Sequence, residues 1–86
     1  MSDLFLQPRD VHVEAEGKVY VPHIRGAERR DGTWEAWIEF QPIDGGPSLA
    51  TACETTQPNR GAVEYWATGL EPVYYEGAFL RASRVG

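Results

Sequence analysis

The sequence predicts an α+β domain in which a mostly antiparallel sheet of four to five strands carries one helix on one face. Three observations favour this fold class. Residues 33–40 alternate between apolar and polar side chains, as a half-buried strand does. Residues 57–68 repeat apolar side chains at the three- and four-residue spacing of an amphipathic helix. The 9 Gly and 6 Pro residues divide the rest of the chain into short segments, which is typical of strands joined by turns.

The first two strands are predicted to form a hairpin. Residues 11–15 and 18–24 each carry an extended pattern of apolar and polar side chains, and Glu16 and Gly17 separate them. A two-residue turn at this point pairs Ala15 with Lys18. It also sets Val13 opposite Tyr20 and Val11 opposite Pro22, all on one face of the sheet.

Residues 33–40 are the clearest strand in the chain. Its inner face takes Trp34, Ala36, Ile38 and Phe40, and its outer face takes Glu35, Trp37 and Glu39. A three-residue loop with Gly32 at positive φ sets Ile24 opposite Ile38, whereas a two-residue turn sets Ile24 opposite a glutamate. The three-residue loop is favoured because it keeps apolar side chains together on the buried face.

A fourth strand and a helix are predicted after the Gly- and Pro-rich segment 42–47. The strand covers residues 48–54. Thr55 or Thr56 then caps the helix over residues 57–68, with Pro58 in its first turn, where a proline loses no helical hydrogen bond. The apolar stripe of this helix is Ala62, Val63, Trp66, Ala67 and Leu70.

The end of the chain has a mixed pattern. Gly69 ends the predicted helix, and Pro72 prevents its continuation. Residues 73–82 are rich in β-formers in their first half and compatible with a helical turn in their second half. We predict a closing strand here, which gives the order strand, strand, strand, strand, helix, strand.

Two resemblances accompany this pattern. Residues 54–60 (Glu-Thr-Thr-Gln-Pro-Asn-Arg) and 64–74 resemble a block found in a family of small uncharacterised bacterial proteins. The strand order around residues 31–36 (Asp-Gly-Thr-Trp-Glu-Ala), followed by Thr51 and a Thr-capped helix, is similar to HicB-type antitoxin domains. Those domains have an acidic pair before the helix, where this chain has Thr-Thr-Gln-Pro. The resemblance implies the fold more than a role; an antitoxin-like regulatory role is one expectation that follows from it.

Composition limits the classes of function. A chain of 86 residues forms one small domain, residues 1–86. Its 8 basic and 13 acidic residues give a net charge of −5, which opposes sequence-independent binding to nucleic-acid phosphates. The single Cys53 excludes an intramolecular disulfide framework. Without a signal-peptide pattern or a run of 18 apolar residues, a cytoplasmic protein with no membrane contact is expected.

Catalytic residues are few. Phosphate-binding, nucleophile-elbow and zinc motifs are absent from the sequence, so no metal and no cofactor is predicted. An enzyme would have to use His12 or His23 with a carboxylate such as Glu14 or Glu39 as a general acid or base. Cys53 beside a histidine would make a thiolate nucleophile, but a single Cys on a strand more commonly packs as a small core residue.

Trp37 is the most informative side chain for function. The predicted register places it on the outer face between two glutamates and directly opposite Arg25. In a structural interpretation, the C-terminal segment or the stem of Arg25 covers the indole. In a functional interpretation, the outer face is a docking patch for another chain that comprises Trp37, Arg25, His23, Val21, Val19 and Glu39.

The arginines are a second candidate. The candidate anion-binding group outside the patch is Arg29, Arg30, Arg81 and Arg84. If they converge beside a tyrosine that stacks on a base (Tyr20, Tyr74 or Tyr75), the domain would bind RNA or an anionic ligand. We favour a non-catalytic interaction or regulatory module that pairs with itself or with a more basic protein. RNA or anion binding and a small histidine enzyme are the alternatives.

Overall fold

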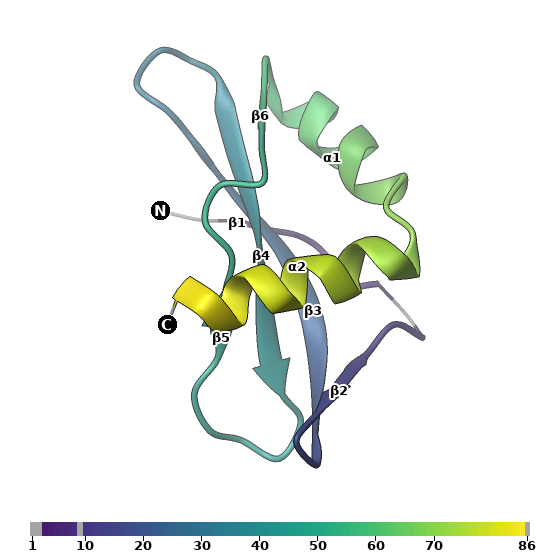
Figure 1. Cartoon of the computed structure of the whole chain (residues 1–86). Coiled ribbons are helices and arrows are strands. Elements are labelled where there is room, and N and C mark those ends of the chain that lie inside the picture. The colour runs from purple at the N-terminus through teal and green to yellow at the C-terminus, as the bar shows by residue number, and fades with distance from the viewer. Residues whose placement is uncertain (1–2, 9, 86) are drawn as a thin grey trace.

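Six strands and two helices make up the fold in the computed structural model, which describes residues 3–8 and 10–85 (Figure 1). The elements are β1 (Asp3–Leu6), β2 (Val13–Ala15), β3 (Lys18–Glu28), β4 (Trp34–Pro42), β5 (Leu49–Ala50), β6 (Thr55–Gln57), α1 (Arg60–Thr68) and α2 (Pro72–Val85). All strand pairs are antiparallel. The predicted α+β class, an antiparallel sheet with helical packing on it, is confirmed.

The hairpin of β3 and β4 forms the centre of the sheet and has the predicted register. Ile24 pairs with Ile38, and Arg25 pairs with Trp37. The Arg29 N–H donates to the Thr33 carbonyl oxygen at 2.7 Å, which leaves a three-residue loop that contains Gly32 at φ 87°. The positive φ explains why a glycine stands there, because a side chain at this backbone conformation is strained.

Short strands flank this hairpin on both sides. The predicted pairs Ala15–Lys18 and Val13–Tyr20 join β2 to one end of β3, but the ladder does not reach Val11. β1 is an addition to the predicted strands and joins the other end of β3. Pro22 lies between these two partners, so its missing N–H breaks no pairing with either of them.

The predicted fourth strand, residues 48–54, is wrong in its extent. Only β5 is regular; the Thr51 N–H still donates to the Ile38 carbonyl oxygen at 2.9 Å, and the regular pairing is then interrupted until β6 pairs with β4. The Thr51 hydroxyl is the reason: its Oγ1 accepts the Ile38 N–H at 3.0 Å, so a side chain replaces a backbone carbonyl. Ala52 and Cys53 are exposed at this interruption.

Helix α1 begins three residues later than predicted. Thr55 to Gln57 form β6, and Asn59 is the N-cap residue, whose Oδ1 accepts the Ala62 N–H at 2.8 Å. An extended threonine pair continues the sheet edge, while Asn59 satisfies a free amide of the first turn. Gly69 ends the helix as predicted.

Replacing Asn59 with Ala is expected to lower the free energy of unfolding by about 1 kcal/mol, because a first-turn N–H loses its acceptor. Thr56→Ala, which removes one of the two predicted capping residues, is the matched control and should change stability by less than about 0.5 kcal/mol. Urea midpoints at unchanged m-value measure both effects. A larger loss in the threonine variant would contradict the observed start of α1.

The predicted closing strand over residues 73–82 is also wrong, because this segment belongs to α2. Pro72 prevents α1 from continuing and is also the first residue of α2, since a proline at the first helical position loses no hydrogen bond. The buried residues of α2 follow a helical spacing: Tyr75, Ala78, Phe79 and Ala82. Both helices therefore lie on the same face of the sheet (Figure 1).

The core lies between this face and the helices. Ile24, Ile38 and Phe40 are fully buried under Tyr75, Phe79 and the small residues of α2. At the other end of the sheet, Phe5 of β1 packs edge-on against Trp34 at 5.8 Å between ring centroids. A Cβ at Gly26 would lie 2.4 Å from the Phe5 ring, so only glycine fits beneath it.

Candidate functional site

The face of the sheet away from the core is the principal candidate surface. Strand alternation and the pairings place on it Val19, Val21, His23, Arg25 and Ala27 of β3, Glu35, Trp37, Glu39 and Gln41 of β4, and the flanking residues Leu4, Glu14, Ala50 and Thr56. We call this set the open face. None of its residues is buried, and the core cluster contains none of them.

All six residues of the predicted docking patch belong to the open face. Trp37 is half-buried at its centre, with Arg25 directly opposite and a glutamate two positions away on each side. The predicted cover by the C-terminal segment does not form, because α2 packs on the inner face. A large aromatic side chain without a covering helix, flanked by charged groups, is typical of a contact surface.

Charges of both signs lie on the open face. Glu39 accepts a hydrogen bond from Gln41 at 2.7 Å, and Glu35 lies 3.9 Å from Arg29 at the end of the hairpin. The Nδ1 atom of His23 is buried without a hydrogen-bond partner. A buried polar atom without a hydrogen-bond partner lowers the free energy of unfolding by about 1–3 kcal/mol. Packing of the side chains around His23 therefore has to offset this cost.

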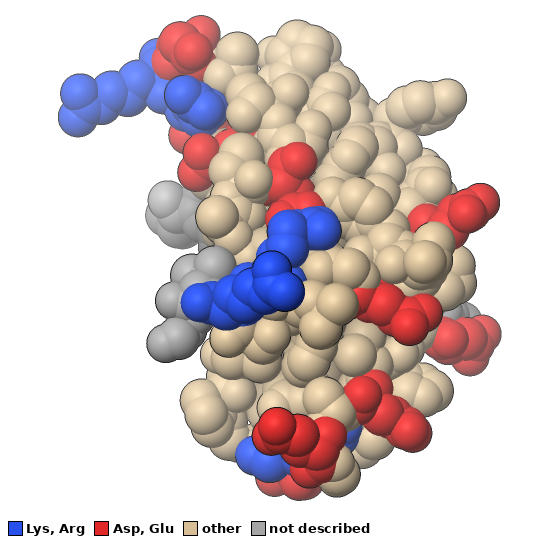
Figure 2. Space-filling model, in the orientation of Figure 1, with Lys and Arg blue, Asp and Glu red and all other residues tan. Residues whose placement is uncertain are grey.

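The predicted anion-binding arginines come from different parts of the fold. Arg29 and Arg30 lie at the end of the β3–β4 hairpin, and Arg81 and Arg84 lie on α2. Arg81 is bound to Glu54, and Arg29 has Glu35 beside it. On the face drawn in Figure 2, Lys and Arg form separate groups with acidic residues near them. This view therefore has no continuous basic patch of the kind that tracks phosphates.

The three tyrosines proposed to stack on bases make packing contacts and hydrogen bonds within the protein. Tyr75 is 1% exposed, and its burial raises its pKa. The Tyr20 ring packs against Phe79 at 4.9 Å, and the Tyr74 hydroxyl donates to Glu54 at 2.5 Å. Stacking on a base needs a free aromatic face, which the buried Tyr75 does not present.

The residues proposed for catalysis do not converge. His12 and Glu14 form an exposed pair at 3.8 Å, and within residues 3–8 and 10–85 no group of three or more His, Cys, Asp or Glu side chains is placed to hold a metal. Cys53 is exposed, so the prediction of a small core residue is wrong; its thiol donates to the Thr55 carbonyl oxygen at 3.2 Å. It lies outside the core because the strand breaks at Thr51.

The best-organised polar cluster joins Glu54 to α2. The Glu54 carboxylate accepts the Tyr74 hydroxyl at 2.5 Å and the Arg81 guanidinium at 2.5 and 3.2 Å, and its side chain is 8% exposed. Burial alone would raise the pKa of Glu54, but the bonds from Arg81 and Tyr74 and the arginine charge lower it overall. Burial and the Glu54 hydrogen bond and charge raise the pKa of Tyr74 to about 12.

Sequence reasoning missed this cluster because its members are 20 and 27 positions apart, and no motif links them. The cluster fastens the interrupted segment after β5 to α2. Both oxygens of the Glu54 carboxylate accept hydrogen bonds from side chains of the protein itself. The cluster therefore has the geometry of a structural connection.

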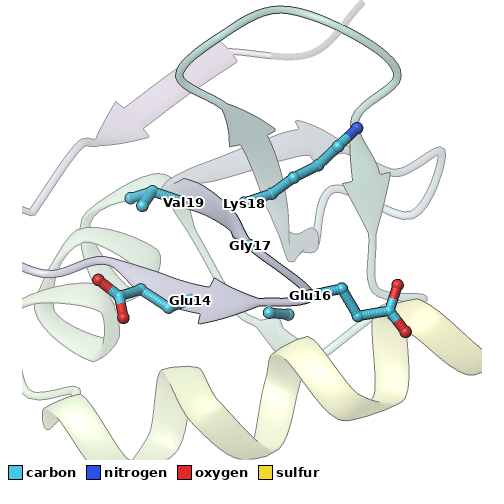
Figure 3. Close-up of a pocket in the computed structure, with 6 residues that line it drawn as sticks. Glu14, Glu16, Gly17, Lys18 and Val19 are labelled. Atoms are coloured by element: carbon cyan, nitrogen blue, oxygen red, sulfur yellow. The ribbon is translucent and has the colours of Figure 1, made fainter.

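Two surface hollows lie near the β2–β3 turn. One, of about 320 Å³, is lined by residues 14–19, and its charged side chains point in different directions (Figure 3). The other, of about 380 Å³, lies between this turn, β5 and α2 and is lined mainly by Tyr20, Leu49, Phe79 and Leu80. Neither holds converging acid–base or nucleophilic groups of the kind that a catalytic site needs.

No family model, no curated protein and no solved structure matches this chain. The similarity to HicB-type domains therefore stays a prediction. The helices of the described part of the chain are too short or too polar to cross a bilayer.

Proposed function

We propose that this protein is a non-catalytic interaction module that binds a second copy of itself through the open face. The observation that carries the proposal is that α1 and α2 both cover the inner face, while Trp37 lies half-buried on the opposite face, which no helix covers. A single sheet layer with a large aromatic group on its outer side gains free energy when a second layer covers it.

The chemistry of the open face supports a second copy as the occupant. The apolar side chains Val19, Val21 and Trp37 supply apolar surface, and its removal from water in an interface stabilises the dimer. The face also carries both signs of charge, so it can complement itself although the whole chain is acidic. A standard interface of about 800 Å² per partner would cover roughly one-seventh of the 5510 Å² surface.

The test is the mass in solution by light scattering from about 1 µM to 1 mM, which spans association free energies of about −8 to −4 kcal/mol. We expect a rise from monomer to dimer in this range. Trp37→Ala should weaken the dimer by about 30-fold, as the loss of an interface hot spot does. Tyr65→Ala, a matched aromatic truncation at the exposed side of α1, should leave the dimer unchanged.

Thermal melting of both variants separates binding from folding. Trp37→Ala should keep a cooperative melt, and Val21→Ser provides a second open-face variant with a smaller volume change. A wild-type protein that stays monomeric over the whole range would refute the proposal. Loss of the cooperative melt in both open-face variants would refute it as well, since these side chains would then serve the fold.

A further inference from the structure

The charges of the open face are divided between its two central strands. On this face β3 carries His23 and Arg25 and no acidic residue between Val19 and Ala27. β4 carries Glu35 and Glu39 and no basic residue between positions 35 and 41. On this face β3 therefore carries the positive charge of Arg25 and no negative charge, whereas β4 carries two negative charges and no positive one; we call these sets the β3 row and the β4 row.

This division selects one arrangement of two copies. We infer that the dimer has a two-fold axis parallel to the strands. The axis lies midway between the two facing sheets, above the line between β3 and β4, so that β3 of each copy lies over β4 of the other. The inference rests on the proposed function. In such a dimer the β3 row of each copy, with Arg25, faces the acidic β4 row of the other, and each contact occurs twice because the interface is isologous.

The other face-to-face arrangement is unfavourable. A two-fold axis across the strands places β3 over β3 and β4 over β4. With the axis level with the Arg25–Trp37 pair, Arg25 would lie near its own equivalent and Glu35 near Glu39 of the partner subunit, and each like-charge contact costs free energy at short range.

The register defines the contacts. Residues paired across β3 and β4 lie at the same level along the strands, so the axis exchanges their positions. Arg25 of one copy therefore lies over Trp37 of the partner subunit, where a guanidinium binds well against an indole face. His23 lies over Glu39 of the partner subunit. With about 10 Å between packed sheets, these long side chains meet by interdigitation.

Charge reversal on one strand at a time tests the arrangement. Arg25→Glu removes the arginine from the β3 row and leaves both rows of that variant acidic. The double variant Glu35→Lys/Glu39→Lys leaves both rows basic. Each variant alone should dimerise at least about tenfold more weakly than wild type, whereas an equimolar mixture should form a heterodimer as stable as the wild-type dimer or more so.

Matched controls remove the effect of net charge. Arg84→Glu and Glu71→Lys/Glu76→Lys carry the same charge changes on exposed positions outside the open face. Alone or mixed, they should dimerise like wild type. Sedimentation velocity measures all species, and circular dichroism melts confirm that each variant is folded.

The outcomes distinguish this inference from the proposed function. If wild type dimerises but the charge-reversed mixture stays monomeric, or each reversed variant dimerises as wild type does, the arrangement is wrong and self-association stands. If wild type is monomeric, both are wrong. Heterodimer formation by the mixture together with weak association of each variant alone supports the arrangement.

Discussion

Replacing Phe79 with Ala is expected to lower the free energy of unfolding by about 3–5 kcal/mol. The ring is 7% exposed and packs against Phe40 at 5.2 Å and Tyr20 at 4.9 Å between centroids. Its removal leaves a cavity where α2 meets the sheet and deletes two aromatic contacts. For a domain of this size, the loss is a large part of the total stability.

The neighbouring residue supplies the control. Leu80 is 60% exposed on the same helix, so Leu80→Ala should change stability by less than about 0.5 kcal/mol. Chemical denaturation of the two variants measures the contrast. Equal losses would contradict the helical orientation of α2, which turns Phe79 inward and Leu80 outward.

Replacing Glu54 with Ala is expected to cost about 1.5–3 kcal/mol at pH 7, because Arg81 and the Tyr74 hydroxyl lose a charged acceptor. Glu64→Ala is the control: it also removes a carboxylate beside an arginine, but its pair with Arg60 is exposed and should contribute less than about 0.5 kcal/mol. Urea unfolding at pH 7 compares the two variants.

The same variant has a defined pH dependence. Since the pKa of Glu54 is lowered in the folded protein, its contribution is complete above the unfolded-state pKa and is lost as the pH falls through the folded-state pKa. The stability difference between wild type and Glu54→Ala should therefore narrow in acid. A difference that stays constant between neutral pH and the acid end of the folded range would show that the carboxylate is not the stabilising form.

The centre of the sheet was predictable because local pattern and burial agree there. In β4, alternate residues are apolar, and only one register with β3 keeps Ile24, Ile38 and Phe40 together. A shift by one residue would turn this whole set toward water. The outward position of Trp37, and with it the candidate site, follows from the same parity.

The C-terminal segment was mispredicted although its sequence contains the necessary signal. Tyr75, Ala78, Phe79 and Ala82 have helical spacing, but the aromatic and β-branched residues at the start favoured a strand. Helix packing on the inner face outweighs this local preference, because a helix turns all four of these side chains toward the core, whereas a strand would place the two aromatic residues and the two alanines on opposite faces.

The amino-acid sequence by itself determined the α+β class, the β3–β4 register and the side of the sheet on which Trp37 lies, since each depends on side-chain periodicity between neighbours in sequence. Only the tertiary structure decided the break at Thr51, the Glu54–Arg81 connection and which of the two competing local preferences of α2, helix or strand, is realised. These depend on hydrogen bonds and packing between segments that are distant in sequence, and the free energy of such contacts is not encoded in any local pattern.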